Sequence, residues 1–162
     1  MFRKILLATD GSEYAFHAAT TALEIAKLNP KAHIHIVYVI DISNAKSDML
    51  QYWNSNGADE QRMEKIKPIV DLIIAARINY SIHFLRGEPG PMLVKYANEE
   101  SFDLVVVGSR GKNRFQELLL GSVSHKVAKG ANCPVMIVKT KELKHPKNVS
   151  TLKEHLKQNQ NI

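Results

Sequence analysis

Short, largely apolar runs recur along the chain and limit the folds it can adopt. They are KILLAT at 4–9, HIHIVYVI at 33–40, YSIHFLRG at 80–87, DLVVVG at 103–108 and PVMIVK at 134–139. Strands that are apolar on both faces are typical of parallel sheets with helices on both sides. The chain is therefore expected to fold around a parallel sheet of five strands.

Segments with helical spacing separate these runs. An alanine-rich helix follows Ser12, which can cap it, and another is expected from Ala58 onward, where Pro68 either kinks the helix or marks its start. Two further helices are expected at 90–100 and 122–131. The apolar stripe of the helix after Ala58 is expected to consist of Met63, Ile66, Val70, Ile73 and Ile74.

The alternation of strands and helices predicts a three-layer, Rossmann-like α/β fold with right-handed crossovers. A chain of 162 residues has the length of one domain, expected at 1–140, with a polar tail at 141–162. If the strand order is 3-2-1-4-5, the loops after the first and fourth strands line one crevice at the carboxyl ends of the strands. Open α/β sheets bind their ligands at that place.

Composition excludes several classes of protein. No apolar run approaches the roughly 18 to 20 residues of a membrane span, and the first ten residues lack the features of a signal peptide. Cys133 is the only cysteine, so neither an intramolecular disulfide nor a cysteine zinc site is expected. The expected location is the cytoplasm, with no membrane contact.

The positive charge is concentrated at the carboxyl end of the chain. The formal net charge is +6, and six lysines with only two glutamates lie in 139–162. A lysine-rich, aromatic-poor segment is typical of a solvated tail, and weak contact with a polyanion is the alternative. Nucleic acid is therefore an unlikely partner.

Glycines are unusually dense after the fourth expected strand. Gly108 and Gly111 could let a ligand approach the backbone, and Gly121 opens a helix whose first residues are Ser122, Val123 and Ser124. Free N–H groups and the positive end of the helix dipole would suit a phosphate group. Neither a Walker A nor a GxGxxG pattern is present. The structural alternative is a turn followed by an ordinary helix start.

Asp10 stands directly after the first expected strand, beside Gly11. An aspartate there can serve the turn or cap the helix. Close to a phosphate chain its carboxylate would repel the ligand, unless it contacts ribose hydroxyls or a divalent cation held mainly by phosphate oxygens. We favour the ribose contact.

Together these segments resemble the universal stress protein (UspA) family. The spacing Gly108-x2-Gly111-x9-Gly121-Ser122 matches that family's nucleotide-binding signature, and KILLATDGSEYA and NCPVMIVK resemble its first and last strands. The resemblance covers 2–139. It implies an ATP-binding, flavodoxin-like regulatory domain that acts in stress responses, usually as a homodimer and without a dedicated catalytic apparatus.

The resemblance also implies a set of nucleotide-binding residues. Val39 would bind adenine through its backbone, Asp10 would face the ribose and phosphate region, and Mg²⁺ or Mn²⁺ would be held through the phosphates rather than by the protein. The full expected set is Ala8, Thr9, Asp10, Val39, Gly108, Arg110, Gly111, Gly121, Ser122, Val123 and Ser124.

Other candidate sites are weaker. His33 and His35 point to the same side of their strand, but the local pattern offers no third metal ligand, so they are expected on an outer, partly exposed face. Ser122, Ser124 and His125 superficially suggest a nucleophile and a base, but no GxSxG elbow surrounds either serine. No catalytic residue is assigned.

Three functions stay open on this sequence. The first is an ATP-dependent regulator read by an unknown protein partner, the second is a slow ATPase, and the third is a stress adaptor with a vestigial pocket. The intact glycine spacing favours the first over the third. The last strand at 134–139 would lie at the sheet edge with unpaired backbone groups, so it is expected to pair with the same strand of a second subunit.

Overall fold

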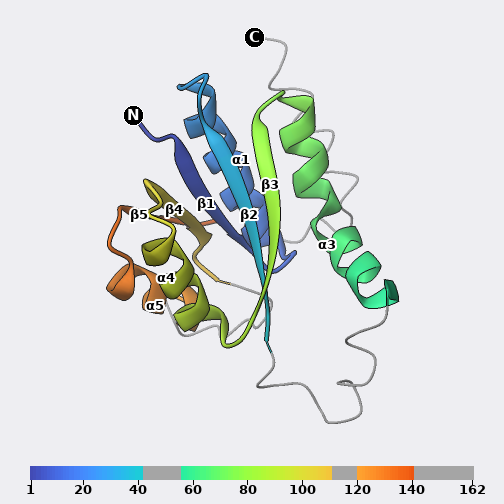
Figure 1. Ribbon diagram of the computed structural model, residues 1–162, viewed down its shortest axis with the longest axis vertical. Helices are drawn as coiled ribbons and strands as arrows, with labels where there is room; N and C mark the ends of the chain where they lie inside the picture. The colour runs from blue at the N-terminus through green and yellow to red at the C-terminus, as the bar shows by residue number, and fades with distance from the viewer. Residues whose placement is uncertain (42–55, 111–119, 141–162) are drawn as a thin grey trace.

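Five parallel strands form the centre of the molecule. The computed structural model describes residues 1–41, 56–110 and 120–140. Its strands lie in the order β3-β2-β1-β4-β5 (Figure 1), which confirms the expected fold class and strand order. They are β1 Lys4–Thr9, β2 His33–Ile40, β3 Asn79–Arg86, β4 Leu104–Gly108 and β5 Val135–Val138.

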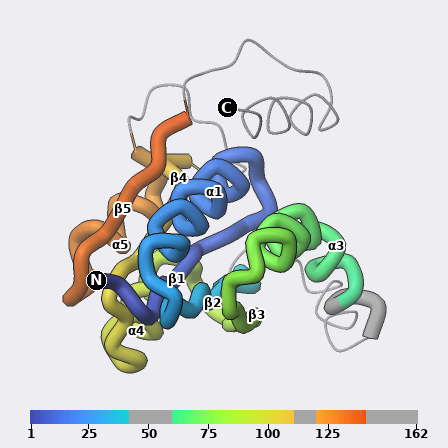
Figure 2. The backbone as a smooth tube through the Cα atoms, turned by 90° about the horizontal axis from the view of Figure 1, so that it is seen from above, coloured from blue at the N-terminus to red at the C-terminus, as the bar shows by residue number. Residues whose placement is uncertain are grey.

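Helices cover both faces of this sheet. Those described are α1 Glu13–Lys27, α3 Asn56–Ala75, α4 Pro89–Glu99 and α5 Ser122–Gly130. Viewed from above, α1 and α3 lie on one side of the sheet and α4 and α5 on the other (Figure 2). No helix within the described ranges has the length and apolar character needed to cross a membrane.

The two faces bury separate apolar clusters. Alternate residues of β1 point to opposite faces, so Ile5 and Leu7 pack under α1 while Leu6 and Ala8 pack under α4 and α5. On the α1 side, alanines fill the contact between helix and sheet and let the helix lie close to the strands.

Helix α3 differs from expectation in its start and in its apolar row. It begins at Asn56, so Pro68 lies inside the helix rather than at its start. Pro68 is exposed, and water can therefore satisfy the carbonyl that loses its amide partner. The buried row is Ile66, Ile69, Val70 and Ile73, whereas Met63 and Ile74 are 37% and 53% exposed. The stripe therefore lies slightly around the helix from the expected position.

The histidines of β2 also differ from expectation. His33 and His35 are partly exposed, as expected, but they lie on the face of the sheet that α4 covers rather than on an outer face. The period-2 pattern correctly put both on one side of the strand. It could not say that α4 and the next strand would bring further polar side chains beside them.

Candidate functional site

The chain leaves neighbouring strands β1 and β4 toward opposite faces of the sheet. After β1 it enters α1 on one face, and after β4 it reaches α5 on the other. The strand order therefore reverses between β1 and β4, which is the point where α/β sheets of this type bind ligands. We call the carboxyl ends of β1, β2 and β4, with the first turns of α1 and α5, the carboxyl-end site.

The turn after β1 is held by its own side chains. The amide of Gly11, whose φ is 74°, donates to Thr9 Oγ1 at 3.1 Å, and the amide of Ser12 donates to Asp10 Oδ1 at 2.9 Å. Ser12 Oγ then accepts from the amide of Ala15 at 3.3 Å and caps α1. The structure thus gives Asp10 the turn role that the sequence left open beside the ribose role.

Gly108 at the end of β4 is required by the packing of α1. A Cβ at this position would lie 2.9 Å from both the carbonyl carbon and the carbonyl oxygen of Tyr14, which are backbone atoms in the first turn of α1. Real Cβ contacts are essentially never that short. Tyr14 was not among the expected site residues, and no local sequence signal could have linked it to Gly108.

The start of α5 is joined to the end of β4. The amide of Gly121 donates to the carbonyl of Ser109 at 2.7 Å, and the buried Ser124 hydroxyl contacts that carbonyl at 3.1 Å and the Gly121 carbonyl at 2.9 Å. Gly121 has φ −69°, so its backbone does not require glycine. Since the hydroxyl hydrogen of Ser124 is directed to carbonyls, this side chain joins the loop to the helix.

The first turn of α5 differs from that of α1 in its capping. Ser12 caps α1 with its side chain, whereas Gly121, the residue at the corresponding position of α5, provides no side-chain hydrogen bond. The first helical backbone bond of α5 runs from His125 to the Gly121 carbonyl, so the amides of residues 122–124 have no acceptor within the helix. Three N–H donors at the positive end of a helix form a favourable place for an anion.

Val39 extends the site along β2. The last residue pair of the β1–β2 ladder is Thr9 with Tyr38, so Val39 lies one position beyond it. The Ile40 carbonyl accepts a hydrogen bond from the amide of Gly87, on the β3 side of β2. Because the backbone groups of successive residues in a strand point to opposite neighbours, those of Val39 point toward β1. If the β1–β2 ladder continued, the Val39 carbonyl would accept the amide of Gly11. That amide donates to Thr9 Oγ1 instead. The ladder therefore stops short of this carbonyl.

The other expected residues are placed as follows. Ala8 is buried and faces α4 and α5, Arg110 is half-buried directly beyond β4, Val123 is half-buried, and Ser122 is exposed. Gly111 lies outside the described residues. Within the described ranges, no three side chains of histidine, cysteine, aspartate or glutamate are arranged to hold a metal ion.

Comparisons with known proteins agree on one family. The model of the universal stress protein family matches residues 1–139. The chain is similar to universal stress protein MJ0531 of Methanocaldococcus jannaschii, with 32% identity over 86% of this chain and 83% of the relative. The solved structure of MJ0577 from the same organism has TM-score 0.78 and 31% identity, covering 88% of this chain and 99% of that one.

A second solved structure carries a ligand. It is a universal stress protein in complex with cAMP, with TM-score 0.63 and 27% identity over 86% of this chain and 98% of that chain.

Proposed function

This chain belongs to the universal stress protein family, and we propose that it is a regulatory protein that binds an adenine nucleotide at the carboxyl-end site. The single observation that carries the proposal is the start of α5, where Gly121 provides no side-chain cap and the amides of residues 122–124 have no acceptor within the helix. The spacing of Gly108, Gly111 and Gly121 and the cAMP complex of a relative support the same ligand class.

The proposed arrangement assigns each part of the nucleotide to a different element. The phosphates contact the first amides of α5, and the ribose lies toward Asp10, whose Oδ1 is already engaged by the amide of Ser12. Adenine contacts the Val39 carbonyl, beyond the end of the β1–β2 ladder. Mg²⁺ is held by phosphate oxygens rather than by a cluster of protein ligands. ATP is the proposed nucleotide because the glycine signature resembles that of the ATP-binding members.

The nucleotide released when the purified protein is denatured tests the ligand class. We expect ATP or another adenine nucleotide, identified by chromatography and mass. Protein that carries none, and that binds neither ATP nor cAMP by calorimetry up to millimolar concentrations, contradicts the proposal. Binding of cAMP alone would keep the adenine and ribose contacts and contradict the assignment of a phosphate chain to α5.

Substitution of Gly121 tests the phosphate position. In Gly121→Val the Cβ lies 3.3 Å from the Ser109 carbonyl, and the branched side chain adds bulk where the phosphates meet α5. Two or three charge-assisted hydrogen bonds would be lost, so ATP should bind at least about a hundredfold more weakly, and adenosine should lose much less. The exposed Ala128→Val adds a β-branched residue to the same helix away from its start and serves as the matched control.

We also propose a homodimer through β5. This strand is at one edge of the sheet, and Met136 in its centre is 37% exposed. Pairing with the same strand of a second copy would satisfy the unpaired backbone groups and cover this side chain. Sedimentation at tens of micromolar should give the dimer mass, because a standard interface of roughly micromolar affinity is mostly formed there. A monomer at that concentration would contradict the proposal.

A further inference from the structure

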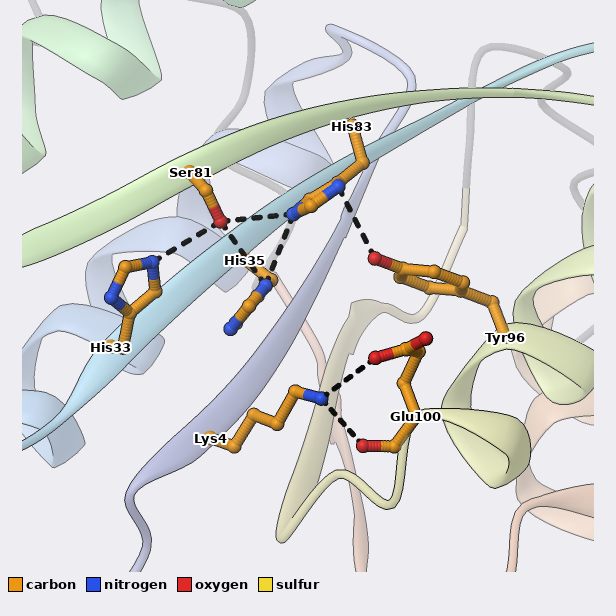
Figure 3. Close-up of polar contacts among 7 residues, drawn as sticks. All are labelled: Lys4, His33, His35, Ser81, His83, Tyr96 and Glu100. Atoms are coloured by element: carbon orange, nitrogen blue, oxygen red, sulfur yellow. Dashed lines mark hydrogen bonds and ion pairs between the residues drawn. The ribbon is translucent and has the colours of Figure 1, made fainter.

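A cluster of polar side chains lies on the α4 side of the sheet, on the neighbouring strands β2 and β3. We call it the histidine cluster, and it consists of His33 and His35 on β2, Ser81 and His83 on β3, and Tyr96 on α4 (Figure 3). In the register of the sheet, His35 is paired with Ser81. All five side chains are half-buried. The cluster therefore connects three elements of the fold through side chains alone.

The Ser81 hydroxyl is the centre of this cluster. Its Oγ lies 3.1 Å from His33 Nε2, 3.1 Å from His35 Nδ1 and 2.9 Å from His83 Nε2. The two imidazoles also meet directly, with 3.1 Å between His35 Nδ1 and His83 Nε2. The other nitrogen of His83, Nδ1, lies 3.2 Å from the Tyr96 hydroxyl.

The contact between His35 and His83 limits the number of protons that the pair can hold. Two ring nitrogens 3.1 Å apart need one proton between them, with one nitrogen donating and the other accepting. The neutral pair satisfies this requirement. One additional proton can go to His83 Nδ1, where the Tyr96 hydroxyl turns to accept. A second additional proton would direct two N–H groups at each other across the same contact.

Charged groups near the cluster come from β1 and α4. Lys4 Nζ of β1 donates to the Glu100 carboxylate at 3.0 Å and to the Glu100 carbonyl at 2.6 Å, beyond the end of α4. The Phe102 ring packs edge-on against His35 with 4.9 Å between ring centroids and shields it from water. The lysine and the apolar ring both oppose positive charge on the imidazoles, and Glu100 favours it.

These surroundings favour the uncharged form of His35 and of His83 in the folded protein. Burial, then positive charge on His33, His83 and Lys4, lowers the pKa of His35 to about 4, against the opposing effect of Glu100. Burial is also the main cause that lowers the pKa of His83, partly opposed by Glu100 and helped by His33 and Lys4. The geometry and the surroundings thus act in the same direction.

We propose that the histidine cluster is a proton sensor that holds β3 and α4 against β2 until His35 and His83 together bind a second proton. The open or unfolded chain takes up protons at about pH 6.5, the ordinary value for histidine. Folded His35 takes up its proton only at about pH 4. Lower pH therefore favours the form in which β3 and α4 have separated from β2. The contribution of these histidines to the free energy of unfolding is constant above pH 6.5 and falls between about pH 6.5 and about pH 4.

Imidazole resonances of the unmodified protein provide the direct test. Carbon-detected titration from pH 8 to pH 4, in the presence of a chelator, should show cluster histidines that titrate well below pH 6 in coupled steps. Hydrogen exchange at pH 5 should accelerate in β3 and α4 more than in β4. Histidines that all titrate in one step near 6.5 would overturn the proposal, whatever happens to the variants.

A double variant separates the cluster from other acid effects. In His35→Gln/His83→Gln the two titrating rings are replaced by neutral amides, and His125→Gln makes the same change at an exposed position on α5. Between pH 7.5 and 5, wild type and His125→Gln should lose roughly 3 to 6 °C more in Tm than the double variant. Parallel profiles for all three proteins would contradict the sensor. If the double variant does not fold, Tyr96→Phe is compared with wild type by the same titration, and an unchanged His83 titration contradicts the Tyr96 contact.

Discussion

The two ends of the sheet are built from different kinds of groups. At the carboxyl end, the groups available to a ligand are mainly backbone: the first amides of α5 and the Val39 carbonyl beyond the last β1–β2 pair. At the amino end, ionisable side chains connect the elements, through the histidine cluster and the ion pair of Lys4 with Glu100.

This difference separates two kinds of response. Backbone amides and carbonyls do not titrate, so an anion bound by them is held over a wide pH range. Imidazole and carboxylate contacts change with every proton that they gain or lose. The comparison therefore teaches that one small domain can carry non-titrating backbone groups and ionisable side-chain contacts at opposite ends of the same strands, with apolar side chains between them.

The largest effect is expected from Gly108→Ala at the carboxyl end. Its Cβ would meet the Tyr14 carbonyl carbon and oxygen at 2.9 Å, and neither β4 nor α1 can move without disturbing the core. Overpacking of this kind should cost about 2 to 3 kcal/mol of unfolding free energy and lower Tm by about 5 to 10 °C. Thermal unfolding followed by circular dichroism measures it.

Gly121→Ala is the matched control for this glycine. The Cβ of the alanine would lie 3.3 Å from the Ser109 carbonyl oxygen, and alanine readily adopts the backbone φ of −69° at this position. The loss of unfolding free energy should therefore be below about 1 kcal/mol. Equal losses of unfolding free energy for the two variants would contradict the distinction between Gly108, which packs against α1, and Gly121, which has room for a side chain.

A smaller effect is expected from Asp103→Asn at the amino end. Asp103 Oδ2 accepts the amides of Arg3 at 2.8 Å and Lys4 at 2.9 Å, and these hydrogen bonds are the main cause that lowers the pKa of its carboxyl group. The carboxylate is exposed, so screening by water should limit the loss at pH 7 to about 0.5 to 1 kcal/mol.

The pH dependence of this variant separates Asp103 from the histidines. A lowered carboxyl pKa gives stability that is present above the unfolded value of 3.8 and is lost as pH falls below it. The difference in Tm between wild type and Asp103→Asn should therefore stay constant from pH 7 to about 5 and close near pH 3. A difference that closes between pH 6.5 and 5 would assign the carboxylate to the same titration as the histidine cluster.

Much of the fold was predictable because its signals are local. The apolar runs identified all five strands, and Ser12 was predicted as a cap because it stands directly before a helical pattern. The error in α3 had a local cause too. Met63 and Ile74 have the apolar character of buried residues, but only contact with the sheet decides which side of the helix is covered.

The candidate site was predictable in part. Sequence spacing grouped Gly108 and Gly121, and the turn role of Asp10 was among the roles that the sequence left open. The contacts of Ser124 with Ser109 could not be predicted, because the 111–119 interval between them carries no pattern that sets how the chain returns to β4.

By itself, the sequence determined the class of fold and the family, because apolar periodicity and glycine spacing can be read along the chain. The expected strand order needed the pairing of distant strands to confirm it. Only the tertiary structure decided that Gly108 faces the backbone of Tyr14 and that His35 meets His83 across two strands. Alternation fixes the face to which a side chain points. The register of the strands and the place where a helix crosses that face decide which distant residue it meets, and both depend on how the whole core packs.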